Sequence, residues 1–422
     1  MLDIEEAELT IVALSPAIFF VSISSVFRGY FNGRQDLKAT ANSQTIEQLF
    51  KTIFTIVIVE IVAIYSKVNT NLMAAGANLA TTCATIGSFL YLYTFYKARR
   101  EELSKEIVTS KNYETKSIAK TVKKILSVSI PMSLSAILAS VNRNIDSITV
   151  KRGLQTFLSK AEAIKQYGIL SGKVDTLITL PLSFNISFAT ALVPALTAAK
   201  EKNDVETIKK RITSSLLITI LIGLPCMVGM FIFAKQILSL LFPNAKEGSF
   251  ILQISSFTII FAMLEQTING ALQGIGKIMT PAISLLIGVM CKLLLNLLLV
   301  SNPKFGAAGA AFATGVCHLV AFLIGYIVLI ENINLDMKFS KFILKPILAT
   351  TVMAICSYSS YFLLSQVFQT KIATIIAIIV AIIMYILSVI TLKVFTKEEI
   401  LMIPCGNKLY RGLEKIKIYK ES

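Results

Sequence analysis

Long stretches without charge dominate the chain. Eight stretches of 18 or more residues contain no Asp, Glu, Lys or Arg, and a membrane-spanning helix needs about 20 predominantly apolar residues. Three further apolar stretches carry only a few charges, among them Glu60, Glu265 and Lys292. The pattern therefore predicts an all-α, polytopic membrane protein with about eleven spanning helices. The predicted spans are 9–27, 46–66, 68–96, 125–142, 176–199, 212–234, 249–272, 280–300, 305–330, 346–370 and 372–392.

Composition and charge agree with this class. Hydrophobic residues make up 55% of the 422 residues and charged residues 16%, whereas a typical soluble domain has about 25% charged residues. A net charge of +16 would suggest nucleic-acid binding in a soluble protein. Here 28 of the 41 Lys and Arg residues fall in alternate connections and the C-terminal tail, as the positive-inside rule describes. We therefore expect a multi-pass protein of the cell membrane, with residues 97–124 and the C-terminus cytoplasmic and no nucleic-acid partner.

The sequence offers little for catalysis or metal binding. The six cysteines lie mostly in apolar stretches, without a CxxC pair or another metal-ligand spacing. No nucleophile accompanies a general base, and no glycine cluster has the strand–loop–helix context of a phosphate-binding loop. We expect neither an enzyme nor a bound cofactor or metal.

Two sequence matches indicate an internal repeat. Residues 29–33 (GYFNG) are similar to residues 270–274 (GALQG), and residues 74–81 (AAGANLAT) are similar to residues 307–314 (AAGAAFAT). Chance similarity between helices rich in Ala and Gly is the alternative. Because the two matches occur in the same order with compatible spacing, duplication is the better interpretation.

The repeat sets the expected domain organisation. It pairs the first three helices with the last three of the second lobe, which has three more helices before them. We therefore expect three N-terminal helices to be missing from this sequence, and a full architecture of six, six and two helices. The expected parts are a three-helix lobe (1–96), a cytoplasmic linker (97–124), a six-helix lobe (125–330), and two extra helices with a basic tail (331–422).

Short motifs carry a family resemblance. Residues 28–33 (RGYFNG), followed by Ser43-Gln44 and Glu47-Gln48, resemble the RGYFxG…SQxxEQ signature of the stage V sporulation protein B group. That group is similar to the MurJ-like lipid II flippases, within the superfamily of multidrug, oligosaccharidyl-lipid and polysaccharide exporters. The residues that match the motif are Gly29, Tyr30, Gly33, Gln44, Glu47 and Gln48.

The resemblance implies both a fold and a function. The fold would be a MATE/MurJ-like two-lobe helical bundle of fourteen helices that works by alternating access. The substrate would be a polyprenyl-pyrophosphate-linked oligosaccharide, lipid II of peptidoglycan synthesis above all, carried by a monomer among membrane lipids in cell-wall synthesis or sporulation. Two alternatives stay open: a cation-coupled multidrug exporter of the same superfamily, and a membrane glycan polymerase or glycosyltransferase.

Charges inside the predicted spans are candidate contacts for a pyrophosphate, which needs cationic partners in a medium of low dielectric constant. Asn142 and Asp146 lie one helical turn apart and share a face, with Arg143 beside them. These three residues either line the substrate cavity or form a closed Arg143–Asp146 pair near the membrane interface.

A second candidate lies just before the uncharged run 176–199. Lys173 precedes this run together with Asp175, and the resemblance implies a basic substrate-contacting residue of the family's eighth helix in this neighbourhood. The alternative is that Lys173 extends along the apolar surface to the outer headgroups.

The third candidate is Lys292, near the middle of its predicted span with Asn296 one turn later. A buried ammonium needs a partner, and Glu265 on the preceding helix is the nearest acid by topology. Structural pairing and substrate binding are both open. Lys51 is the repeat mate of Lys292 and lies close to Glu47.

Two further residues have a structural and a functional interpretation. Arg28 is either a positive-inside anchor at the end of the first span or a first contact for the pyrophosphate at the inner mouth. His318, the only histidine, is either a packing residue or a proton carrier.

Overall fold

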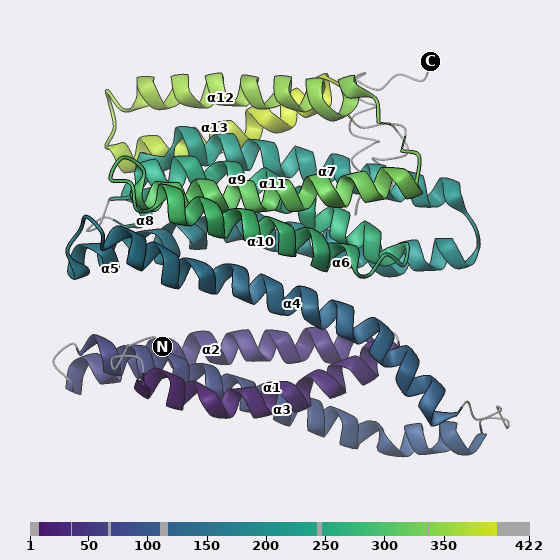
Figure 1. Cartoon of the computed structure of the whole chain (residues 1–422). Coiled ribbons are helices and arrows are strands. Elements are labelled where there is room, and N and C mark those ends of the chain that lie inside the picture. The colour runs from purple at the N-terminus through teal and green to yellow at the C-terminus, as the bar shows by residue number, and fades with distance from the viewer. Residues whose placement is uncertain are drawn as a thin grey trace. The chain divides into compact units, whose positions relative to one another are not determined.

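The architecture is helical throughout the part of the chain that the structure describes. The computed structural model describes residues 8–34, 36–65, 69–109, 117–242, 247–335 and 337–394. Every described element is a helix, which confirms the predicted all-α class. The chain divides into two compact units, residues 1–116 and residues 117–422. Figure 1 shows their helices in chain order, from purple to yellow.

The first unit consists of three helices, α1 (Glu8–Gly33), α2 (Leu37–Tyr65) and α3 (Thr70–Thr109). Helix α3 packs along both α1 and α2, whereas α1 and α2 touch each other little. Because α3 continues to Thr109, most of the expected linker 97–124 is helical where it is described. Its first part belongs to α3, and its last part begins the next helix.

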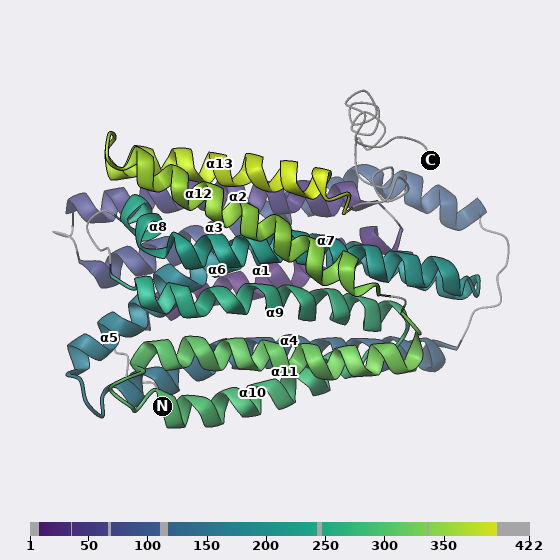
Figure 2. The same cartoon turned by 90° about the horizontal axis from the view of Figure 1, so that it is seen from above.

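The second unit holds the remaining helices. In Figure 2, α9 runs between α7 and α11, and it also packs against α6. Lys160 to Glu201 forms one continuous helical path, in which a π-helical segment, Ile169–Val174, joins α5 to α6. The helices are α4 (Ile118–Leu154), α5 (Lys160–Gly168), α6 (Asp175–Glu201), α7 (Val205–Ile232), α8 (Ala234–Leu241), α9 (Ser249–Gly274), α10 (Thr280–Leu299), α11 (Gly306–Asn332), α12 (Lys345–Leu364) and α13 (Thr370–Thr391), with a second π-helical segment at Ser340–Leu344.

Ten helices of the described chain are long and apolar enough to cross a membrane. The sequence pattern predicted eleven, and the difference is the span 68–96 within α3. That stretch has no charge, but its many Ala, Gly, Thr and Asn residues lower its mean hydropathy below that of the other spans. The uncharged length alone therefore overstates how apolar this helix is.

The two repeat triplets pack in the same way. In the second unit α11 packs along both α9 and α10, which touch each other little, just as α3 does with α1 and α2. A Cβ added at Gly76 would lie 2.9 Å from Ile58 Cγ2, and a Cβ at the matching Gly309 would lie 2.8 Å from Leu299 Cβ. Ile58 and Leu299 are themselves related by the 241-residue shift. The repeat in the sequence therefore corresponds to a repeated helix contact.

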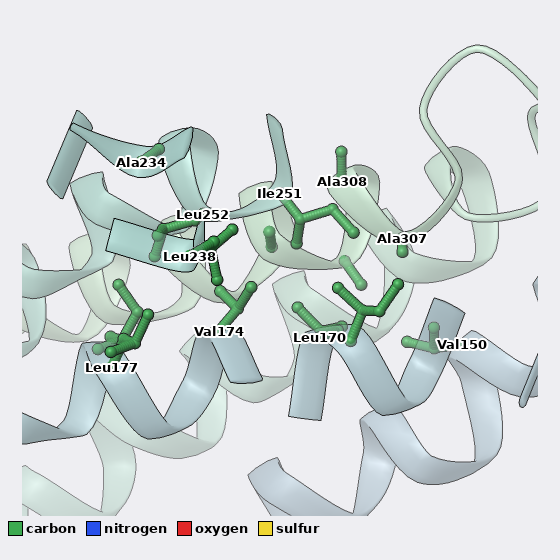
Figure 3. Close-up of a cluster of buried hydrophobic side chains, with 14 of the residues drawn as sticks. Val150, Leu170, Val174, Leu177, Ala234, Leu238, Ile251, Leu252, Ala307 and Ala308 are labelled. Carbon is green, nitrogen blue, oxygen red and sulfur yellow. The ribbon is translucent and has the colours of Figure 1, made fainter. Parts of the chain in front are cut away.

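A large buried apolar cluster joins helices from the first two thirds of the second unit. Figure 3 shows Leu170, Val174 and Leu177 from the α5–α6 path packed against Leu238 and Leu252 from α8 and α9. Alanines at the start of α11 complete the cluster because their small side chains let the helix come close. This packing fixes the helices whose polar side chains form the candidate site.

A proline interrupts the backbone hydrogen bonding of α7. Pro225 has no N–H, so it cannot bond the carbonyl of Leu221 one turn earlier. The hydroxyl of Tyr385, on α13, donates to that carbonyl at 2.6 Å. The hairpin of α12 and α13 is thus joined to α7 by a polar contact as well as by apolar packing.

Candidate functional site

A buried ion pair joins α10 to α4 inside the second unit. Lys292 is 1% exposed, and its Nζ donates to Asp146 Oδ2 at 2.6 Å. The same ammonium donates to the Asn142 carbonyl oxygen at 2.9 Å and to Asn142 Oδ1 at 3.0 Å. All three N–H donors of the ammonium are therefore used. Asn142, Asp146 and Lys292, three of the predicted site residues, meet at one place.

Helical spacing explains how two side chains of each helix reach the other. Asn142 and Asp146 lie one turn apart on α4, and Lys292 and Asn296 lie one turn apart on α10. The Nδ2 of Asn296 donates to Asp146 Oδ1 at 2.9 Å and to Thr149 Oγ1 at 2.9 Å. Both carboxylate oxygens of Asp146 are thus bonded, which offsets part of the cost of burying the charges.

Glu265 is not the partner of Lys292, and that expectation is wrong. The Glu265 Oε2 lies 2.6 Å from Nδ1 of His318, so α9 is paired with α11. The Nδ2 of Asn269, one turn later on α9, donates to Glu265 Oε1 at 3.3 Å. The sequence could not distinguish the two acids because it does not show which faces of α4, α9 and α10 turn toward one another.

Arg143 stands apart from this cluster. Its side chain is exposed, and within the described ranges it has no hydrogen bond and no ion pair. The alternative pair with Asp146 is not formed, since both oxygens of Asp146 bond to α10. A cation next to the uncharged run 125–142 is costly unless water or an anion reaches it.

Lys173 lies in the π-helical segment between α5 and α6. Its Nζ lies 5.6 Å from the centroid of the Phe242 ring, a cation–π contact with the end of α8. The side chain is partly buried, whereas Asp175 at the start of α6 is exposed. Lys151 makes a similar contact, 5.0 Å from the centroid of Tyr167. Both lysines thus lie against aromatic rings near one end of the second unit.

Arg28, on α1, is hydrogen-bonded to both of the other helices of the first unit. Its Nη2 donates to Glu47 Oε2 at 2.7 Å on α2 and to Ser88 Oγ at 2.8 Å on α3, and its Nε donates to Ser43 Oγ at 3.0 Å. The side chains of Arg28 and Glu47 are partly exposed, by 18% and 23%. Arg28 and Glu47 of the RGYFxG and SQxxEQ motifs therefore form one polar network that holds the three helices together.

The other motif residues are exposed. Nothing lies within 4 Å of a Cβ added at Gly29 or Gly33, whereas a Cβ at their repeat mate Gly270 would lie 2.6 Å from the Ala189 carbonyl oxygen. The glycines of α9 thus allow close packing on α6, while those of α1 border open space. Tyr30, Gln44 and Gln48 are exposed as well.

One buried polar network was missed from the sequence. Asn185 on α6 is fully buried; its Nδ2 donates to the Met263 carbonyl at 2.9 Å, and its Oδ1 accepts from Thr219 on α7 at 3.0 Å. Thr219 and Thr267 on α9 are 2.7 Å apart. The sequence contained one sign of this network, which is an asparagine in the middle of a long apolar helix.

The described residues contain no cluster of His, Cys, Asp and Glu able to hold a metal ion. A cavity of about 560 Å³ opens where the loops before α5, α9 and α11 meet. It is lined by Phe157, Phe250 and Phe305 and contains the ion pair of Lys165 with Glu247, 2.9 Å apart. None of its lining residues belongs to the Lys292 or the Glu265 cluster.

Comparison with known proteins gives the class. A model of the family described as polysaccharide biosynthesis protein matches residues 2–200, and a model described as MatE matches residues 172–298. The solved structure of lipid II flippase MurJ in an inward closed conformation superposes with a TM-score of 0.61 at 18% identity, covering 90% of this chain and 72% of that one. The fold is thus that of the multi-pass membrane proteins of the MurJ and MATE type.

The curated relatives narrow this class. The chain is 26% identical to stage V sporulation protein B of Bacillus subtilis, over 83% of this chain and 66% of that protein. It is 25% identical to lipid II flippase MurJ of Bacillus subtilis, over 80% of this chain and 62% of that protein. It therefore spans about two thirds of their length. The chain is thus similar to the polysaccharide biosynthesis protein family over residues 2–200, and to lipid II flippase MurJ over most of its length.

Proposed function

We propose that the chain acts in moving a polyprenyl-pyrophosphate-linked oligosaccharide across the cell membrane by alternating access, with lipid II as the first candidate substrate. The match of residues 2–200 to the polysaccharide biosynthesis protein family and the similarity to a lipid II flippase support a lipid-linked glycan. In this proposal residues 97–124 and the C-terminus lie on the cytoplasmic side, and the protein works as a monomer. The roles in cell-wall synthesis and sporulation belong to the same proposal.

The observation that carries the proposal is the exposed guanidinium of Arg143. It follows an uncharged stretch of α4 and has no partner among the described residues. A guanidinium forms two parallel hydrogen bonds with a phosphate, and such charge-assisted bonds are about twice as strong as neutral ones. Arg143 is therefore the residue we assign to the pyrophosphate.

The other candidates take different parts in the proposal. Lys292, Asp146 and Asn142 hold α4 against α10 and so fix the direction in which Arg143 points; their ammonium is saturated by protein oxygens. Lys173 contributes a second positive charge near the same end of the unit. Arg28 holds the first unit together, and we assign it a contact with the entering pyrophosphate only through its partly exposed edge.

The test is transport of a fluorescent lipid II by the purified 422-residue chain in liposomes. The wild-type chain should accelerate the exchange of the lipid between leaflets. Arg143→Ala should weaken apparent substrate affinity about ten- to a hundredfold, since losing a charge-assisted bond costs about 1.5–3 kcal/mol. Arg143→Lys should recover part of the affinity, because a lone ammonium lacks the bidentate geometry.

Arg152→Ala is the matched control, because Arg152 is exposed on the same helix near its end. It should leave the affinity unchanged. Equal transport by the wild type and Arg143→Ala would remove Arg143 from the site. No acceleration by the wild-type chain, with a known flippase active in the same liposomes, would contradict the function itself. Acceleration of a multidrug cation instead would favour the exporter alternative.

A further inference from the structure

The only histidine of the chain forms a buried pair with an acid. The Nδ1 of His318 on α11 lies 2.6 Å from Glu265 Oε2 on α9. The Glu265 side chain is 7% exposed and that of His318 is 19% exposed. At this distance a proton must lie between the two atoms, because an unprotonated Nδ1 and a carboxylate would direct lone pairs at each other. The transport site proposed above makes no use of this pair.

The Glu265–His318 pair is the group in these surroundings whose net charge depends on a single proton. Lys292 from α10 and Asp146 from α4 neutralise each other nearby. Lys292, Glu265, Asp146 and the thiol of Cys291 all act electrostatically on the buried thiol of Cys317, the residue before His318. With Glu265 ionised, the pair is neutral when both ring nitrogens of His318 carry protons and carries one negative charge when one does. An unbalanced buried charge is strongly unfavourable, so the two forms differ greatly in free energy.

A second observation points to a hydrogen-bond donor beside the acid. The Oδ1 of Asn269 is buried and has no donor within the described part of the chain, while its Nδ2 bonds Glu265. Buried amide oxygens are almost always bonded. This oxygen is placed to accept from a water or another protonated group that also reaches the carboxylate.

The position of α9 connects the pair to the rest of the unit. It is the most buried of the candidate spans. Its Gly270 and Gly274 lie against the α6 backbone, and its Thr267 bonds Thr219 of α7. Near Thr267, α6 and α7 contribute polar but uncharged side chains, those of Asn185 and Thr219. A change in the bond between α9 and α11 therefore acts on the helix to which α6 and α7 are attached.

We propose that Glu265 and His318 form a proton-binding site that couples transport to the proton gradient. One proton is taken up by the pair from one side of the membrane and released to the other in each cycle, with no other bond made or broken. This coupling rests on the proposed transport function. The existence of the proton site itself does not, and the two are tested separately.

The first experiment needs no substrate. Because His318 is the only histidine, the chain labelled with ¹⁵N-histidine and purified through a histidine-free tag gives signals from this ring alone. The ring-nitrogen signals of the wild type in lipid bilayers should change reversibly when the pH is varied, and in Glu265→Gln the change should occur at a different pH. Glu331→Gln removes an exposed acid from α11, the helix that carries His318, and its signals should match those of the wild type. Signals that do not change with pH, or the same change in wild type and Glu265→Gln, would overturn the proton site.

The second experiment measures coupling. A pH difference of one unit across the liposome membrane should shift the steady distribution of fluorescent lipid II by about tenfold if one proton is coupled per substrate. Glu265→Gln and His318→Asn should abolish this shift but still equilibrate the lipid, whereas Glu331→Gln should keep it. A wild-type chain that transports but ignores the pH difference would overturn the coupling. A chain that does not transport lipid II at all contradicts the proposed function and its coupling, while the ¹⁵N signals still decide the proton site.

Discussion

Two charged side chains of the apolar helices, Lys292 and Arg143, have opposite surroundings. Lys292 is saturated by three oxygens of α4, so its charge is balanced within the protein. Arg143, one residue beyond Asn142, is exposed and has no partner in the described ranges. Because a helix turns by about 100° per residue, neighbours in sequence face different surroundings. Asn142, which bonds the buried ammonium, and the exposed Arg143 can therefore be neighbours in the sequence.

The Lys292–Asp146 pair leads to a prediction about stability. Lys292→Met leaves a buried carboxylate without its cation and should cost about 3–5 kcal/mol of unfolding free energy. The double variant Lys292→Met with Asp146→Asn should recover most of that loss, because Asn296 and Thr149 can still bond an amide. Thermal unfolding of the purified variants measures both. A single variant as stable as the wild type would mean that Asp146 is not confined as the structure shows.

The sequence predicted a large part of this arrangement and missed the rest for a physical reason. Asn142 and Asp146 share a face because helical periodicity requires it, and this followed from their spacing alone. The partner of each acid depends on how α4, α9, α10 and α11 are rotated against one another, which no local pattern records. For the same reason the sequence analysis assigned Lys292 to the wrong acid and did not predict the bond from Arg28 to Ser88, 60 residues away. The helical class and most spans followed from hydropathy, which is a property of single stretches.

Whole helices are placed by small residues where backbones meet closely. The repeated glycines of α3 and α11 allow equivalent contacts with α2 and α10. In α9, Gly270 leaves no room for a Cβ, because the obstacle is the backbone of Ala189 and not a movable side chain. The matching Gly29 of α1 has open space around it. Gly29 and Gly270 are therefore equivalent positions of the repeat that are both glycine but differ in how closely their neighbours pack.

This difference gives a matched pair of substitutions. Gly270→Ala should destabilise the chain by about 1–3 kcal/mol through overpacking. Gly29→Ala should be neutral, or stabilising by up to about 1 kcal/mol, because Ala is the better helix former and meets no neighbour. The two midpoints of thermal unfolding in the same detergent give the comparison. Equal effects of the two variants would show that the α6–α9 contact is looser than described.

At the scale of the whole molecule, the two units hold their own polar networks. The Arg28 network connects the three helices of the first unit, and the networks of Lys292, His318 and Asn185 connect α4, α6, α7, α9, α10 and α11 of the second. Each unit is thus fixed internally by bonds that lipid cannot replace. This organisation suits a transporter in which rigid parts move and helices within each part do not.

The orientation proposed from the basic connections can be measured directly. In a background without its six cysteines, Glu101→Cys on α3 should react with a membrane-impermeant thiol reagent only after intact cells are opened. Lys160→Cys, at the start of α5, should react in intact cells, because its end of the second unit is predicted to lie outside. Both side chains are exposed, so access does not depend on local packing. The reverse pattern of labelling would invert the topology.

The hydrogen bond from Tyr385 to the Leu221 carbonyl determines how far the protein can be shortened. A shortened design that ended after α11 would remove the Tyr385 hydroxyl, which donates to the Leu221 carbonyl. Pro225 has no N–H and cannot donate to that oxygen. In hydrocarbon an unsatisfied backbone group costs several kcal/mol, and no lipid tail can supply a proton. The hairpin of α12 and α13 therefore completes the backbone hydrogen bonding of α7, so a shortened version of this protein must retain it or replace Pro225 at the same time.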